Sequence, residues 1–105
     1  MTSPELQQEI EAATLHRLFE HLRGHPEVQN IDLMLLADFC RNCLAKWYAD
    51  EAAKRGVPTD YAAAQAIVYG MPYADWKAQF QKPATPEQLQ AFEQRQRNQQ
   101  NAANA

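Results

Sequence analysis

The sequence predicts an all-α protein, a small array of about five helices with a long hairpin of two helices at its centre. The 105-residue chain contains only three glycines and six prolines and is rich in alanine and glutamine, which favours helices over strands. No segment alternates strictly between apolar and polar residues, as a half-buried strand would. Apolar residues make up 46% of the chain, which is enough for one small core in a single domain over residues 1–93.

The first helix is expected to begin near Pro4 and to end at about Arg23, because Gly24 follows. We expect Thr2 to cap this helix, with Glu5 closing a capping box three residues later.

The apolar residues of this first helix do not stay on one face. One side carries Leu6, Ile10 and Ala13, and the nearly opposite side carries the cluster of Leu15, Leu18, Phe19 and Leu22. The helix therefore either breaks near residues 13–14 or packs its first half against a different body, such as a second copy of the chain.

A second helix is expected from Ile31 to about Arg55, between the cap Asn30 and the terminator Gly56. A helix of about 25 residues spans about 38 Å. A compact protein of this length is only about 26 Å across, twice its radius of gyration. We therefore expect an extended protomer that pairs with a partner.

This second helix carries more apolar residues than one core-facing stripe needs. The stripe that faces the core comprises Leu33, Leu36, Phe39, Cys40, Cys43, Leu44 and Trp47. Ile31, Met34 and Leu35 add apolar surface beside it. Together with Leu6 and Ile10, these residues form the predicted interface of an intertwined or side-by-side homodimer.

Three shorter helices are expected in the rest of the chain. The third runs from Asp60 to about Tyr69 after the cap Thr59, and the fourth runs from Pro72 to about Gln81. The fifth opens at residues 85–88, where a threonine and a glutamine three residues apart form a capping box. Residues 94–105 are polar and of low complexity, so we expect a disordered tail there.

Cys40 and Cys43 form a C-x-x-C motif that allows three interpretations. A redox motif places its attacking cysteine at a helix N-terminus, where the helix dipole lowers the thiol pKa. Cys40 is instead expected about ten residues inside a helix, among apolar neighbours, which argues against redox chemistry. We therefore favour two buried cysteines that act as small hydrophobic residues.

The third interpretation is a metal site, with zinc as the candidate ion. His21 and His25 are four residues apart and Cys40 and Cys43 three apart, so each pair shares a helical face. In a simple hairpin, however, His21 would stand roughly 9 Å from the cysteines along the helix axis. An intrachain site would need an offset hairpin, and a dimer could supply ligands from two chains.

The corner between the third and fourth helices is rich in aromatic residues. Tyr69, Met71, Tyr73 and Trp76 are of the types that favour binding surfaces. The alternative is that they close the core, with Trp76 and Phe80 inside it. A small pocket near this corner and the cysteines would be the place for an enzyme active site, but no catalytic motif names its substrate.

Charge and targeting signals narrow the class of partner. The net charge is −3, so the chain lacks the excess of basic residues with which proteins attract nucleic-acid phosphates. No apolar run is long enough to span a membrane, and residues 1–13 resemble no secretory signal. We therefore expect a cytoplasmic protein with reduced thiols, and no nucleic-acid or membrane partner.

Several unusual strings of residues occur in one order: QNIDLM at residues 29–34, FCRNCL at 39–44, WY at 47–48 and YGMPY at 69–73. In these strings the chain resembles a family of short bacterial proteins that is labelled only as a domain of unknown function. The resemblance covers roughly residues 15–85 and implies a small, all-helical, dimeric protein without an established activity. It includes His21 but does not require a histidine at position 25, and it supplies no catalytic residues.

These observations favour a non-catalytic homodimer that acts as an interaction module. The alternatives are a protein that binds zinc or iron through Cys40, Cys43 and a histidine, and a small enzyme of unknown substrate.

Overall fold

The structure is a computed structural model that describes residues 2–104 of the chain. It confirms the predicted all-α class, with six helices in this range rather than about five. The helices are α1 (Pro4–Arg23), α2 (Asn30–Ala37), α3 (Arg41–Lys54), α4 (Tyr61–Tyr69), α5 (Tyr73–Phe80) and α6 (Pro86–Asn104). Within these residues, none of the helices has both the length and the apolar character that crossing a membrane requires.

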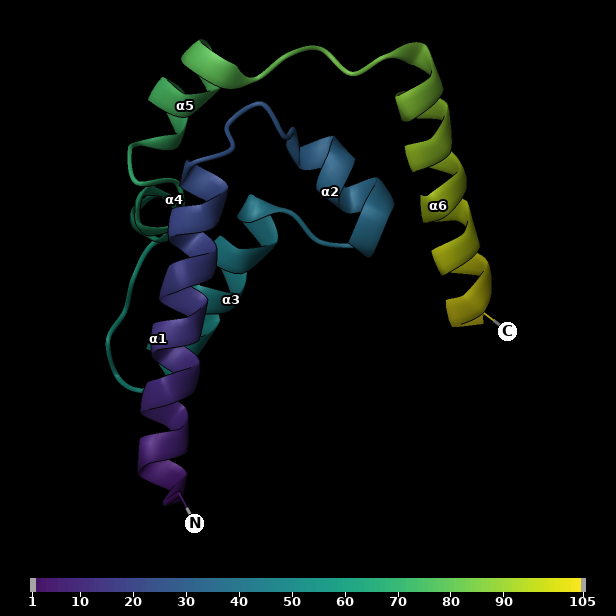
Figure 1. The fold of residues 1–105 in the computed structure, drawn as a ribbon. Coiled ribbons are helices and arrows are strands. Elements are labelled where there is room, and N and C mark those ends of the chain that lie inside the picture. The colour runs from purple at the N-terminus through teal and green to yellow at the C-terminus, as the bar shows by residue number, and fades with distance from the viewer. Residues whose placement is uncertain (1, 105) are drawn as a thin grey trace.

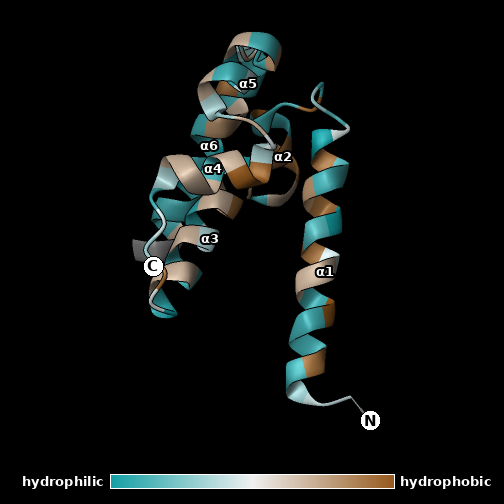
Figure 2. Ribbon diagram, turned by 90° about the vertical axis from the view of Figure 1, so that its left-hand side faces the viewer, coloured by the Kyte–Doolittle hydropathy of each residue, from teal (hydrophilic) through white to brown (hydrophobic). Residues whose placement is uncertain are grey.

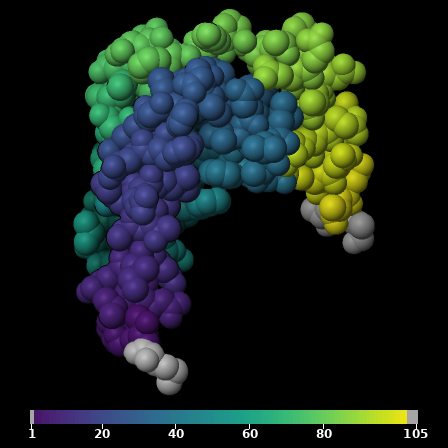
Figure 3. Space-filling view, viewed as in Figure 1, coloured from purple at the N-terminus to yellow at the C-terminus, as the bar shows by residue number. Residues whose placement is uncertain are grey.

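The helices form an arch with α1 and α6 as its two legs (Figure 1). The α5 helix and the segment that follows it lie along the top, and α2 and α3 lie between the legs. The space-filling view shows a hollow on the underside of the arch (Figure 3). The radius of gyration is 16.1 Å, against about 13 Å for a compact chain of this length. The molecule is therefore extended.

The core is small and lies where the end of α1 meets α3, α4 and α5. Its buried members are Phe19, Leu22, Leu44, Ala45, Ala64, Val68, Tyr69 and Trp76. The Arg23 side chain adds a polar link from α1 to the end of α4, because it donates to the carbonyl oxygens of Val68 and Ile67. Gly70 ends α4 in the left-handed conformation, with a φ of 75°. The Arg23 side chain passes close to it, so that a Cβ atom at position 70 would lie 2.8 Å from Nε of Arg23.

The predicted helix from Ile31 to Arg55 is wrong, because the chain breaks between α2 and α3. Asp38 ends α2 in the left-handed conformation, with a φ of 65°, and Cys40 is extended. The α2 helix has only eight residues, so it spans about 12 Å rather than 38 Å. Two members of the predicted core stripe are exposed as a result, Leu36 at 83% and Trp47 at 54%.

The α1 helix runs unbroken through residues 13–14. The alternative in which this helix breaks there is therefore wrong. Its cap is Ser3 rather than the predicted Thr2, since the Ser3 hydroxyl accepts from the Leu6 amide at 3.1 Å. Only Phe19 and Leu22 of this helix are buried. Its first half contributes nothing to the core.

Two shorter helices follow the prediction closely. The α4 helix ends at Tyr69 as expected, but its cap is Asp60 rather than Thr59, because the Asp60 carboxylate accepts from the Ala63 amide at 2.7 Å. The α5 helix occupies residues 73–80, within one residue of its predicted bounds.

The start of α6 confirms the predicted capping box. The Thr85 hydroxyl accepts from the Gln88 amide at 3.1 Å, and the Gln88 side chain accepts from the Thr85 amide at 3.0 Å. The same Gln88 side chain donates to the Asp32 carboxylate on α2 at 2.8 Å. This contact turns α6 toward α2.

The helix then continues to Asn104, where the sequence predicted a disordered tail from residue 94. Contacts with the end of α2 hold this extension: Arg95 pairs with Asp38 and donates to the Leu35 carbonyl, and Gln99 donates to Asp38 at 2.8 Å. The α6 helix therefore packs along α2, and Ile31, Met34 and Leu35 are only partly exposed. Part of the apolar surface that was predicted for a partner chain is covered by this chain itself.

Candidate functional site

The C-x-x-C motif lies at the start of α3, where three segments of the chain meet. Cys40 is the N-cap residue of α3 and is buried, and Cys43 lies in the first turn and is partly exposed. The expectation that Cys40 lies ten residues inside a helix is therefore wrong, and with it the reason that argued against redox chemistry. Burial nevertheless raises the pKa of the Cys40 thiol, although the amides of Cys43 and Asn42 partly oppose this effect. Cys40 is thus a protonated thiol at neutral pH, as a buried structural cysteine would be.

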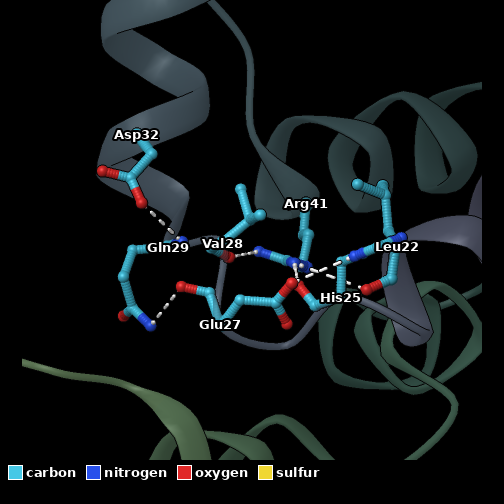
Figure 4. Close-up of polar contacts among 7 residues, drawn as sticks. All are labelled: Leu22, His25, Glu27, Val28, Gln29, Asp32 and Arg41. Carbon is cyan, nitrogen blue, oxygen red and sulfur yellow. Dashed lines mark hydrogen bonds and ion pairs between the residues drawn. The ribbon is translucent and has the colours of Figure 1, made fainter.

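Arg41, between the two cysteines, has a nearly inaccessible side chain with an exposed fraction of 1%. Its guanidinium donates to the carbonyl oxygens of Val28 at 2.7 Å, His25 at 3.1 Å and Leu22 at 3.5 Å (Figure 4). These oxygens belong to the end of α1 and to the segment that follows it. The group also lies over the Trp76 ring, 4.9 Å from its centre. Arg41 thus holds the connection between α1 and α2 against the core.

Arg41 was not among the candidate functional residues that the sequence predicted. The only signal was a charged residue in the middle of the apolar stripe of the predicted second helix. Its partners are main-chain carbonyl oxygens 13 to 19 residues away, which no side-chain pattern reveals.

A chain of hydrogen bonds continues from Arg41 toward the surface. The Asn30 side chain accepts from Arg41 at 3.2 Å and donates to the Tyr69 hydroxyl at 2.9 Å. The Tyr69 hydroxyl donates to the Asn42 side-chain carbonyl at 2.7 Å, and Gln65 donates to the same oxygen at 3.1 Å. Burial raises the pKa of Tyr69 above its ordinary value, so the hydroxyl keeps its proton. We call Arg41, Asn30, Tyr69, Asn42 and Gln65 the polar chain.

The four predicted metal ligands are not brought together. Among the residues that the structure describes, no group of three or more His, Cys, Asp or Glu side chains could hold an ion. The His21 and His25 rings pack against each other, with centres 4.6 Å apart, and His25 also contacts the Glu27 carboxylate at 3.0 Å. Cys40 instead points into the protein. Within the described part of one chain, His21, His25, Cys40 and Cys43 thus do not make up a ligand set, and a site shared between two copies stays a prediction.

The aromatic corner lies in and against the core rather than on the surface. Tyr69 and Trp76 are buried, with ring centres 5.0 Å apart, and Met71 and Tyr73 pack against the same cluster. Tyr69 and Trp76 are therefore inaccessible to a partner.

An open groove of about 640 Å³ separates the first half of α1 from the second half of α3. Its apolar lining includes Leu15 of α1, Tyr48 of α3 and Val57 beyond it, all at least 38% exposed. Leu6 and Ile10 do not line this groove; they lie on the opposite side of α1 from Leu15 and are 48% and 53% exposed. Figure 2 shows this part of α1 as a leg that stands apart from the other helices and carries bands of apolar residues.

The sequence matches the model of a known protein family. A family model with the description "Protein of unknown function (DUF1244)" matches residues 28–94. This range contains the polar chain, both cysteines and the contact between Gln88 of α6 and Asp32 of α2. No curated protein matches the chain.

Proposed function

Because the chain belongs to the DUF1244 family of proteins of unknown function, we propose its function from its geometry: it is a non-catalytic interaction module that acts as a homodimer. The observation that carries this proposal is the first half of α1. Leu6 and Ile10 present about half of their surface to solvent on a helix that protrudes from the core. We place the dimer in the cytoplasm, whose reducing conditions suit the two free cysteines.

A protruding helix needs a partner for its stability. Isolated helices shorter than about 12–15 residues are marginal in water, and most helical stability in proteins comes from packing an apolar face. Residues 4–14 of α1 have neither a packed face nor a long Ala-rich run. A second surface that covers Leu6 and Ile10 would supply the missing packing energy.

A second copy of the same chain suits this surface. The groove between α1 and α3 offers the partner's α1 an apolar lining, and in a twofold dimer each copy gives a helix and receives one. The charges favour an antiparallel arrangement of the two α1 helices. Their first halves carry Glu5, Glu9 and Glu11, and an antiparallel pair places these acids near Arg17 of the other copy.

Sedimentation equilibrium at micromolar concentration tests the proposal. We expect the wild-type chain to sediment as a dimer and the double variant Leu6→Asp, Ile10→Asp as a monomer, because each dimer would then bury four unpaired carboxylates. The matched control is Leu36→Asp, since Leu36 is 83% exposed on α2, away from the groove. This control is expected to remain a dimer.

Circular dichroism of the same three proteins separates loss of pairing from loss of folding. The thermal transition of the core should remain in the double variant, because Leu6 and Ile10 do not contact the core. A wild-type monomer at high micromolar concentration would contradict the proposal, as would a double variant that remains a dimer.

A further inference from the structure

A second cavity, of about 310 Å³, opens at the end of the polar chain. The N-terminus of α2, the first turn of α3 and the segment after α5 surround it, and its lining includes Asn30, Asn42, Tyr73, Gln81 and Lys82. This cavity is separate from the groove between α1 and α3 and is not used by the proposed dimer.

The donor and acceptor roles along the polar chain follow from Arg41. A guanidinium can only donate, so the Asn30 atom that faces it must be the oxygen, and the Asn30 NH₂ group then faces Tyr69. The Tyr69 hydroxyl accepts that bond and therefore uses its proton on Asn42. As a result, the side-chain amides of Asn30 and Asn42 in the polar chain can each take only one orientation.

Asn42, the member of the polar chain that accepts from Tyr69, lines the cavity and consequently retains a side-chain donor. Its oxygen already accepts from Tyr69 and Gln65, both on α4. Its NH₂ group has no partner among the contacts of the described residues, and Asn42 lines the cavity. A ligand with a hydrogen-bond acceptor would satisfy it.

Lys82 supplies a positive charge at the same cavity. Among the lining residues that the structure describes, it carries the one formal charge. Gln29 fixes the segment around Lys82: its side chain accepts from the Lys82 amide at 2.9 Å and donates to the Phe80 carbonyl at 2.9 Å. The cavity wall is therefore formed before any ligand arrives, which lowers the entropic cost of binding.

Part of the remaining lining suits an apolar body, and Gln29, Asn30 and Gln81 contribute polar side chains beside it. Tyr73 contributes a ring whose hydroxyl is already occupied by Gln81 at 2.9 Å, and Ile31 and Pro83 add aliphatic surface. We propose that this cavity binds a small monocarboxylate, with one carboxylate oxygen accepting from the Asn42 NH₂ group, the charge balanced by Lys82 and the apolar body against Tyr73. A single lysine matches one negative charge, so a phosphate dianion would remain partly unbalanced.

The test compares butyrate with butyramide, its uncharged isostere, in amide NMR titrations of the full chain. We expect butyrate to shift the Asn42 side-chain NH₂ resonances in a saturable way, and butyramide and inorganic phosphate to bind at least roughly tenfold more weakly. The Lys82→Gln variant should weaken butyrate binding by roughly tenfold, because it removes the charge and keeps a side chain of similar length. Lys77→Gln, on the exposed side of α5, is the matched control and should bind as the wild type does.

Four outcomes would overturn the proposal. One is equal binding of butyrate and butyramide, another is unchanged affinity in Lys82→Gln, and the third is phosphate binding as tightly as butyrate. Resonance shifts that spread over the surface without saturation would overturn it as well. Neither lysine variant touches the core, so the spectrum of each verifies its fold in the same experiment.

Discussion

Arg41 occupies a position in which a charged side chain is normally costly, and its surroundings explain why it is stable there. The guanidinium donates to the Leu22 carbonyl in the last turn of α1, at the negative end of the helix dipole, and to the His25 carbonyl just beyond the helix. Five donors in a planar fork can serve several oxygens at once, whereas a lysine ammonium has only three donors around a single point. Burial lowers the pKa of Arg41, but the surrounding carbonyl oxygens replace the water that the cation loses.

Replacing Arg41 by lysine should therefore destabilise the protein while keeping its charge. We expect Arg41→Lys to lower the free energy of unfolding by roughly 2–3 kcal/mol, because at least one charge-assisted bond to a buried carbonyl is lost. Urea denaturation followed by circular dichroism measures this loss. Arg17→Lys, at an exposed position on α1, is the control and should change stability little. Equal stabilities of the two variants would show that the Arg41 contacts contribute nothing.

Single capping residues were predictable to within one position. Ser3 caps α1 where Thr2 was expected, and Asp60 caps α4 where Thr59 was expected. In both cases two good capping residues are adjacent, and the choice between them depends on which backbone amide each can reach. The role of Arg41 was not predictable, because it depends on carbonyl groups that converge only in the folded chain.

At the scale of whole helices, the break between α2 and α3 is the main departure from the sequence-based prediction. Residues 31–55 contain neither glycine nor proline, so nothing local predicts an interruption. The break lies at Asp38, whose left-handed conformation is stabilised by Arg95 and Gln99 of α6. Long-range contacts thus override a helical pattern that is continuous in the sequence. The same contacts explain why α6 extends beyond residue 93.

The contribution of Arg95 can be tested against a neighbouring arginine on the same helix. We expect Arg95→Ala to detach the second half of α6 from α2, because it removes the ion pair to Asp38 and the bond to the Leu35 carbonyl. Hydrogen–deuterium exchange should become faster over residues 95–104. Arg97→Ala should leave exchange nearly unchanged, since the hydrogen bond that Arg97 makes within the described residues is to Gln94, in an exposed pair. Similar exchange in both variants would mean that Arg95 does not hold α6.

For the molecule as a whole, the sequence predicted an extended protomer, and the protomer is extended, but for a different reason. The expected cause was one helix too long for the globule. In the structure, α2 and α3 are short and the two ends of the chain project instead, as α1 and α6. The change of apolar face along α1 was the more useful signal, because both buried residues of α1, Phe19 and Leu22, lie in its second half, although Leu15 and Leu18 of the same predicted cluster are exposed.

A homodimer formed through α1 should reveal itself by its dependence on protein concentration. We expect amides in residues 4–14 to exchange faster at low than at high micromolar concentration, because this half of α1 would lose its packing partner on dilution. Exchange in α4, which lies in the core, should not depend on concentration. If residues 4–14 exchange at the same rate at all concentrations, α1 is not the surface through which copies pair.

The spacing of the contacts along the chain also bears on the order in which the protein can assemble. Arg41 reaches its carbonyl partners across 13 to 19 residues, whereas α6 reaches α2 across 56 to 61. Closing the shorter loops costs less chain entropy. The connection between α1 and α3 can therefore form while α6 is still free, and Asp38 would receive its stabilising partners only after the rest of the arch is in place.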